Sequence, residues 1–172
     1  MQRIHLPIHC ASWLLLVAGI ALCSTSQAAD WEAIQPARTL EKELISLFGS
    51  PQEIVVTFPW TEWSARWKIR PNSTNYVLRY RSDGPKSTLL HGPGGLADGV
   101  EASVFNGIVH SVTWQYGGPS ARDAARLLRS DPGVSFMSQE SPTTGSKVMP
   151  YGVLFIEIGR GDTSVKISLE LK

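Results

Sequence analysis

Apolar and polar residues alternate through several runs of this sequence, and this period of two constrains the fold more than any other feature. The clearest run covers residues 63–70, where two tryptophans, an alanine and an isoleucine alternate with Ser64 and three basic residues. Residues 76–81 show the same pattern. Successive side chains of a strand point to opposite faces, so both runs are typical of strands with one buried and one solvated face.

Turn residues between such runs predict antiparallel pairing. Asn106-Gly107 separates residues 100–105 from 108–116, and this dipeptide is the strongest short hairpin signal. Residues 71–75 supply turn chemistry between the two alternating runs. We therefore expect those two runs to pair as a hairpin.

The last predicted hairpin turns at residues 160–161. This turn sets Ile156 opposite Val165 and Leu154 opposite Ile167. All four residues then share one face, as a half-buried pair of strands requires.

Two helices are predicted. Residues 40–48 carry apolar residues at helical spacing, Thr39 can cap the start, and Gly49 follows the end. The second helix begins at Ser120, where Asp123 can complete the cap. Four small or apolar residues of this helix face inward: Ala121, Ala124, Ala125 and Leu128.

The order helix, strands, helix, strands indicates an α+β fold. We expect residues 30–172 to form a single β-rich globular domain, since that length is ample for one core. The sheet is predicted to be mostly antiparallel and twisted, with about six to eight strands in hairpins and two short helices on its apolar face.

Two stretches are interpreted as loops. Residues 83–98 contain Gly92-Pro93-Gly94-Gly95, which lacks the lysine and hydroxyl residue of a phosphate-binding loop and is expected to be a flexible surface loop. Residues 138–149 are polar and long for a connection. Their small tip, residues 142–146, could enter a cleft on another protein.

Residues 1–29 have the features of a cleaved secretory signal. Arg3 precedes an apolar run at residues 11–22, and the small residues 26–29 suit a signal peptidase. The run is short for a membrane anchor, so no membrane span is expected. A lipoprotein is the other alternative, although Leu22 stands before Cys23 where a lipobox wants a small residue. The segment predicts export to the periplasm.

Removal of this signal would leave the remaining chain without cysteine and without net charge. Both cysteines, Cys10 and Cys23, lie in the signal, so the mature chain would have no disulfide and no thiol. Of the 16 basic residues only Arg3 is removed, so 15 basic residues remain and balance the 15 acidic residues. A neutral chain does not favour nucleic acid as a partner, and we expect no cofactor.

Catalytic or metal-binding residues are not predicted. Only His91 and His110 remain after cleavage, and neither lies at metal-ligand spacing or near a recognisable nucleophile motif. His91 is the better candidate for a general base, whereas His110 lies inside a strand. The tripeptide at residues 160–162 spells Arg-Gly-Asp, but its glycine is what a tight turn requires, so we interpret it as a turn rather than an adhesion motif.

A basic face is predicted on the sheet. Pairing Ile69 with Tyr76 places Arg66 opposite Arg79. Three more basic residues share that face: Lys68, Arg70 and Arg81. Like charges paired across strands are unfavourable. The face is therefore either a surface for an anionic partner or a solvated face relieved by acids of neighbouring strands such as Glu101 or Glu170.

The signal, the size, the two hairpins and the small-residue loops resemble periplasmic immunity proteins of type VI secretion systems. That resemblance implies a binder that neutralises a peptidoglycan-degrading effector, such as an amidase, by occluding its active site. It also implies that a loop rich in glycine and serine enters the effector's Cys-His cleft. Gly145 and Ser146, with Thr144 beside them, are the first candidates for that loop.

Two other functions remain open. The segment Leu47-Phe48-Gly49-Ser50-Pro51 and the later segment 105–109 look like parts of the small helix-plus-sheet lipoproteins that support outer-membrane assembly. That likeness implies a structural accessory of the envelope. The third hypothesis is an envelope hydrolase that uses His91.

Overall fold

The computed structural model describes residues 30–57, 75–83, 89–137 and 143–171. The predicted signal and the candidate residues Arg66, Lys68 and Arg70 therefore lie outside the described residues. The helical elements are η1 (Trp31–Ala33), α1 (Glu41–Phe48), α3 (Gly118–Ser130) and η2 (Arg160–Asp162). The strands are β1 (Glu53–Val56), β2 (Asn75–Arg81), β3 (His91–Gly92), β4 (Gly95–Leu96), β5 (Gly99–Phe105), β6 (Ile108–Gly117), β7 (Ser135–Phe136), β8 (Thr143–Met149), β9 (Gly152–Ile158) and β10 (Ser164–Glu170).

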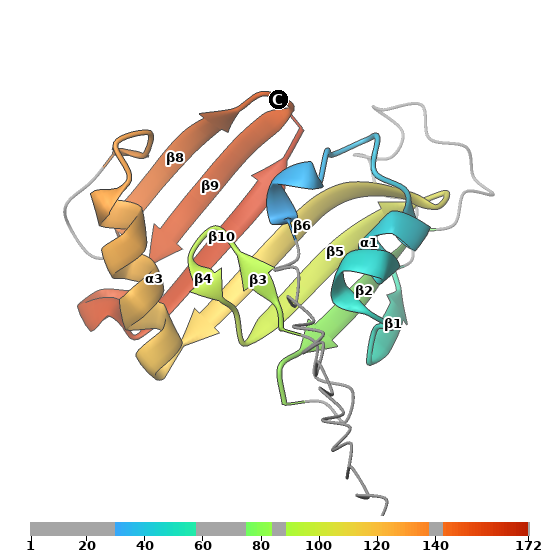
Figure 1. Ribbon diagram of the computed structural model, residues 1–172, viewed down its shortest axis with the longest axis horizontal. Coiled ribbons are helices and arrows are strands. Elements are labelled where there is room, and N and C mark those ends of the chain that lie inside the picture. Colours follow the sequence, from blue (N-terminus) through green and yellow to red (C-terminus); the bar gives the residue numbers. More distant parts are fainter. Residues whose placement is uncertain (1–29, 58–74, 84–88, 138–142, 172) are drawn as a thin grey trace, which may run out of the picture.

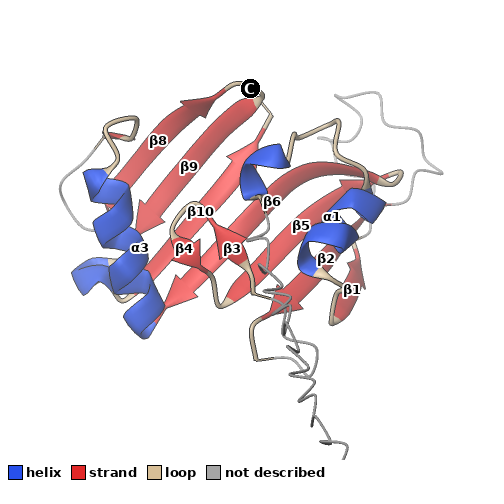
Figure 2. Cartoon of the chain, in the orientation of Figure 1, coloured by secondary structure: helices blue, strands red, loops and turns tan. Residues whose placement is uncertain are grey.

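Eight strands form one antiparallel sheet in the order β1-β2-β5-β6-β10-β9-β8-β7. The helices and the small β3-β4 hairpin lie on one face of it (Figures 1 and 2). The predicted α+β fold with a mostly antiparallel sheet and two helices is confirmed.

The sheet consists of two similar halves. In each half a helix precedes four strands: α1 comes before β1, β2, β5 and β6, and α3 comes before β7, β8, β9 and β10. The halves meet where β6 pairs with β10, and their strand orders mirror each other about that pair. An approximate twofold axis through the β6-β10 pair therefore relates them.

The register supports this relation residue by residue. In the first half Val100 lies opposite Trp114, and in the second half Leu154 lies opposite Leu169. Two residues further along, Ala102 opposite Val112 corresponds to Ile156 opposite Ile167. All of these side chains are buried under the helices.

The two hairpins next to the axis differ in their turns. Asn106 and Gly107 have φ values of 50° and 76°, as a two-residue turn of the predicted type needs. The β9-β10 turn is longer, since Gly159 N–H donates to the Ser164 carbonyl across η2. Ile156 consequently pairs with Ile167 rather than with Val165. The predicted register was wrong by two residues, although the faces were correct.

The predicted hairpin between residues 63–70 and 76–81 is also wrong. β2 pairs with β1 on one side and with β5 on the other, so both of its edges are occupied. Arg79 lies opposite Glu53 and Glu101. The described neighbours of Arg79 are therefore two acids, where the prediction had set Arg66.

The core lies between the sheet and the elements on its covered face. Leu44 and Phe48 of α1 are buried, and the predicted inward face of α3 is buried as well. Thr39 does not cap α1, because its hydroxyl accepts a hydrogen bond from the Gln35 N–H at 2.8 Å. Instead Glu43 accepts one from the Leu40 N–H.

The start of α3 depends on a carboxylate from another segment. Ser120 Oγ accepts from the Gly117 N–H and donates to Asp98 Oδ2 at 2.7 Å. Asp98 also accepts from the Gly117 N–H at 2.6 Å. Asp123, which was expected to complete the cap, pairs with Arg126 instead.

The glycine-rich segment is a packed part of the core rather than a flexible surface loop. Trp114 Nε1 donates to the His91 carbonyl, and the Gly94 N–H donates to the buried Tyr116 hydroxyl. A Cβ on Gly92 would lie 2.4 Å from Trp114 Cδ1. Only glycine lets this backbone approach the two rings so closely. The segment that was expected to be a flexible loop instead forms the short β3-β4 hairpin.

The stretch 138–149 was expected to be a loop, and this is wrong over residues 143–149. These residues form β8, which pairs with β9 along its whole length and with β7 at Gly145 and Ser146. Gly145 and Lys147 at its centre hid this strand, because glycine and lysine are depleted in strands.

Gly92→Ala should destabilise the domain by about 1–3 kcal/mol, the usual effect of overpacking a core. Urea unfolding followed by tryptophan fluorescence measures the change. Gly117→Ala is the matched control, because its Cβ would meet nothing closer than Asp98 Oδ2 at 3.5 Å and its φ of −132° suits any residue. Equal stability of the two variants would contradict the packing described for Gly92.

Candidate functional site

The face of the sheet opposite the helices is the main candidate for a functional surface, and we call it the open face. It is formed by the side chains that alternate with the buried ones along each strand. No helix or strand within the described ranges lies on this side of the sheet (Figure 2).

One row of the open face crosses all eight strands. The register places its members opposite one another in the order Glu53, Arg79, Glu101, Thr113, Ser168, Phe155, Ser146 and Ser135. A second row lies beside it and contains Val55, Val77, Ser103, Ser111, Glu170, Val153 and Val148. Together these rows make a broad surface whose side chains differ in charge and polarity from β1 to β8.

The first half of the open face is charged but internally neutralised. Arg79 Nη1 lies 3.2 Å from Glu53 Oε2, and Arg79 Nε lies 3.0 Å from Glu101 Oε1. The hydrogen bond to Glu53 and the charge of Glu101 raise the pKa of Arg79. Arg79 is thus relieved by acids of neighbouring strands, one of which is the predicted Glu101.

The centre of the open face carries short hydroxyl side chains. Thr113 and Ser168 lie on the two axis strands, and their hydroxyl oxygens are 3.0 Å apart. Ser103 and Ser111 are paired one row away, and all four are half-buried. A partner can therefore approach the backbone closely at this point.

The second half of the open face carries an apolar cluster among polar residues. Val148 and Val153 are direct cross-strand partners, and Phe155 follows two residues later on β9. Val148 is 66% exposed and Phe155 is 45% exposed. Adjacent exposed apolar residues are more informative than isolated ones, because contiguous patches mark interaction sites.

The sequence-predicted binding residues occupy different places on this framework. Gly145 is buried, and a Cβ there would lie 2.8 Å from the Phe136 ring, so it cannot enter a cleft on another protein. Thr144 is exposed and Ser146 is half-buried on the open face. Arg79 and Arg81 share that face, but five strand spacings, or about 24 Å, separate β2 from β8.

The two histidines lie in different surroundings. The His91 imidazole makes no hydrogen bond or ion pair with any described residue, and its backbone pairs with Leu96. The His110 ring packs edge-on against Phe105 at 5.6 Å, and burial lowers its pKa. Among the described residues no group of three His, Cys, Asp or Glu side chains could hold a metal ion.

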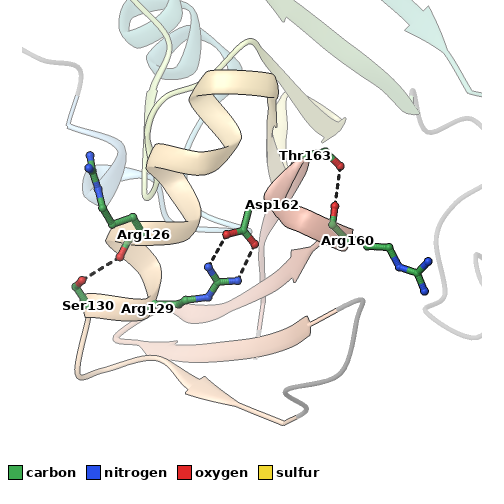
Figure 3. A network of polar contacts seen from close by, with 6 residues as sticks. All are labelled: Arg126, Arg129, Ser130, Arg160, Asp162 and Thr163. Carbon is green, nitrogen blue, oxygen red and sulfur yellow. Dashed lines mark hydrogen bonds and ion pairs between the residues drawn. The ribbon is translucent and has the colours of Figure 1, made fainter.

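The Arg-Gly-Asp tripeptide forms the tip of the β9-β10 hairpin, and its acid is already engaged. Arg129 of α3 holds Asp162 through two hydrogen bonds of 2.6 and 2.7 Å, as Figure 3 shows. The Arg129 guanidinium lowers the pKa of Asp162. This pair fastens the helix to the hairpin, which agrees with the interpretation of the tripeptide as a turn.

Comparisons with known proteins return no match, whether to a family, to a curated protein or to a solved structure. In the described part of the chain no helix is long and apolar enough to cross a membrane.

Arg129→Ala should lower the free energy of unfolding at pH 7 by about 0.2–1 kcal/mol, the range for partly exposed ion pairs. The lowered pKa of Asp162 means that this contribution is present above the ordinary carboxyl pKa of about 4 and is lost as the pH falls through the folded value. Urea unfolding at pH 7, 4 and 2 tests this.

Arg126→Ala is the control for that series, because Arg126 and Asp123 are 75% and 66% exposed. It should change stability less than Arg129→Ala at pH 7. A difference between wild type and Arg129→Ala that persists undiminished at pH 2 would contradict the assigned ion pair.

Proposed function

We propose that the mature chain is an exported binding protein that docks another protein on its open face. Its finer role would be that of a periplasmic immunity protein, which neutralises a peptidoglycan-degrading effector by occluding the effector's active site. The observation that carries the proposal is the open face itself, with its hydroxyl centre and its cluster of exposed Val148 and Phe155 beside half-buried Val153.

The size of the open face suits a specific protein partner. Eight strands span seven spacings, about 34 Å, and seven-residue strands are about 23 Å long. Their product is roughly 800 Å², which is about the area that each partner buries in a standard protein interface. The groups on this surface are those of an interface, since an apolar anchor lies beside polar side chains.

The charges of the open face favour a partner without strong net charge. Arg79 is neutralised by two glutamates, and Lys166 lies opposite Glu157 on the neighbouring strand. A strongly anionic partner, which the basic-face hypothesis required, would meet acids as often as bases. Complementarity of shape and apolar contact would therefore carry most of the affinity.

Because Gly145 is buried in the sheet, we propose a different way of blocking the effector from the plugging loop expected from the sequence. A plug formed by residues 144–146 would have to leave a strand that is paired on both sides. Docking of the whole open face over the effector's cleft requires no such rearrangement. We therefore place the occluding surface on the sheet and centre it on Phe155.

The other two hypotheses have less support from the described residues. An envelope hydrolase would need a partner that activates His91, and the imidazole forms no hydrogen bond or ion pair with a described residue. An envelope accessory would be lipidated at Cys23, which metabolic labelling with a fatty acid would detect.

Phe155→Glu should weaken binding to the partner about 10-fold to 100-fold, as expected for loss of a central apolar anchor. The partner is first captured with residues 30–172 and identified, and its cell-wall hydrolysis is then measured with and without the wild-type domain. Affinity for the purified partner is measured by calorimetry.

Leu127→Glu is the matched control, because Leu127 is 49% exposed on α3 at the covered face and should leave affinity unchanged. The proposal is wrong if both variants bind like wild type, or if the captured protein hydrolyses cell wall equally well with the domain present. Unfolding curves of both variants confirm that each is folded.

A further inference from the structure

A small apolar groove lies on the helix-covered side, where η1 meets the turn between β8 and β9. Its walls include the rings of Trp31 and Tyr151 and the prolines Pro36 and Pro150, and Leu169 lies at its base. These residues come from three parts of the chain that are far apart in sequence. The groove is therefore a product of the fold, and no sequence motif indicated it.

The volume of the groove limits what can fill it. It holds about 130 Å³, whereas sites for drug-sized ligands and cofactors measure about 300–1,000 Å³. A cavity of about 150 Å³ accommodates one benzene ring. The groove therefore matches a single leucine or phenylalanine side chain rather than a cofactor.

The walls of the groove are held in place before any ligand arrives. Trp31 packs edge-on against the buried Trp114 with ring centres 6.0 Å apart. Ala37 has a φ of 61°, a conformation unfavourable for alanine, and stands between Pro36 in the wall and Arg38. The Arg38 guanidinium lies 5.5 Å from the centre of the Tyr151 ring. Such rigidity lowers the entropy lost on binding.

The charge is negative at the end of the groove where η1 begins, whereas the Arg38 cation lies against the Tyr151 ring. Glu32 is the one charged residue among those that line the groove, and Asp30 precedes it by two residues. Asp30 Oδ1 accepts a hydrogen bond from the Glu32 N–H. Neither carboxylate forms an ion pair with a described residue. Both are available to a cation that approaches along the groove.

We infer that this groove binds one apolar side chain of a partner's peptide segment, with a lysine or arginine beside that side chain facing Glu32. The apolar side chain would fill the space between Trp31 and Tyr151, and the cation would lie near the two acids. The site is on the opposite side of the sheet from the open face, so this inference does not depend on the proposed function.

Three capped pentapeptides test the inference by chemical-shift mapping on the isotope-labelled mature chain. One carries Lys-Phe-Lys at its centre, one Glu-Phe-Glu and one Lys-Ser-Lys. The first should shift the amides of Tyr151 and Gly152 and bind at least threefold more tightly than the second. The third should produce no saturable shift, because it lacks the apolar side chain.

Two exposed substitutions locate the effect. Glu32→Lys should abolish the preference for Lys-Phe-Lys over Glu-Phe-Glu. Tyr151→Ala should lower the affinity for the Lys-Phe-Lys peptide at least threefold. Asp123→Lys makes the same charge change on α3 and should have no effect.

Any of three results would overturn the inference. These are saturable shifts that map elsewhere, equal affinity for the two phenylalanine peptides, and self-association of the free protein that Tyr151→Ala abolishes. In the last case the occupant of the groove would be a second copy of this chain.

Discussion

The burial of Trp114 at the middle of the sheet is the interaction on which the other features depend. The ring is fully buried on the axis strand β6, and two separate segments, β3 and η1, pack against it. The His91 carbonyl accepts its N–H, Gly92 lies against its edge, and Trp31 packs on it from η1. The covered face is thereby closed, and Trp31 becomes a fixed wall of the small groove.

The two similar halves explain why one face of the sheet is uniform and the other is not. On the covered face both halves must fill a common core, so corresponding positions such as Ala102 and Ile156 are both apolar. The open face is free of that constraint. It carries neutralised charges around Arg79 and a small apolar cluster of Phe155, Val153 and Val148. This divergence is what a surface selected for one partner would have, and it supports the proposed binding role.

Local patterns predicted much of this fold and little of the candidate site. Asn106-Gly107 and the apolar stripe of α3 act within a few residues, so the β5-β6 hairpin and the second helix were correct. The glycine-rich segment was misjudged, since glycine is common in flexible loops and its closeness to Trp114 arises only in the tertiary structure. The neighbours of Arg79 were missed for a related reason, because strand order is set by pairings distant in sequence.

The central claim is that a partner covers the open face, and hydroxyl-radical labelling of the complex tests it most directly. Phe155 and Leu127 are similarly exposed in the free domain, at 45% and 49%, but lie on opposite sides of the sheet. On adding the captured partner, labelling of Phe155 should fall severalfold while labelling of Leu127 stays unchanged. Protection of Leu127 with continued labelling of Phe155 would contradict the account.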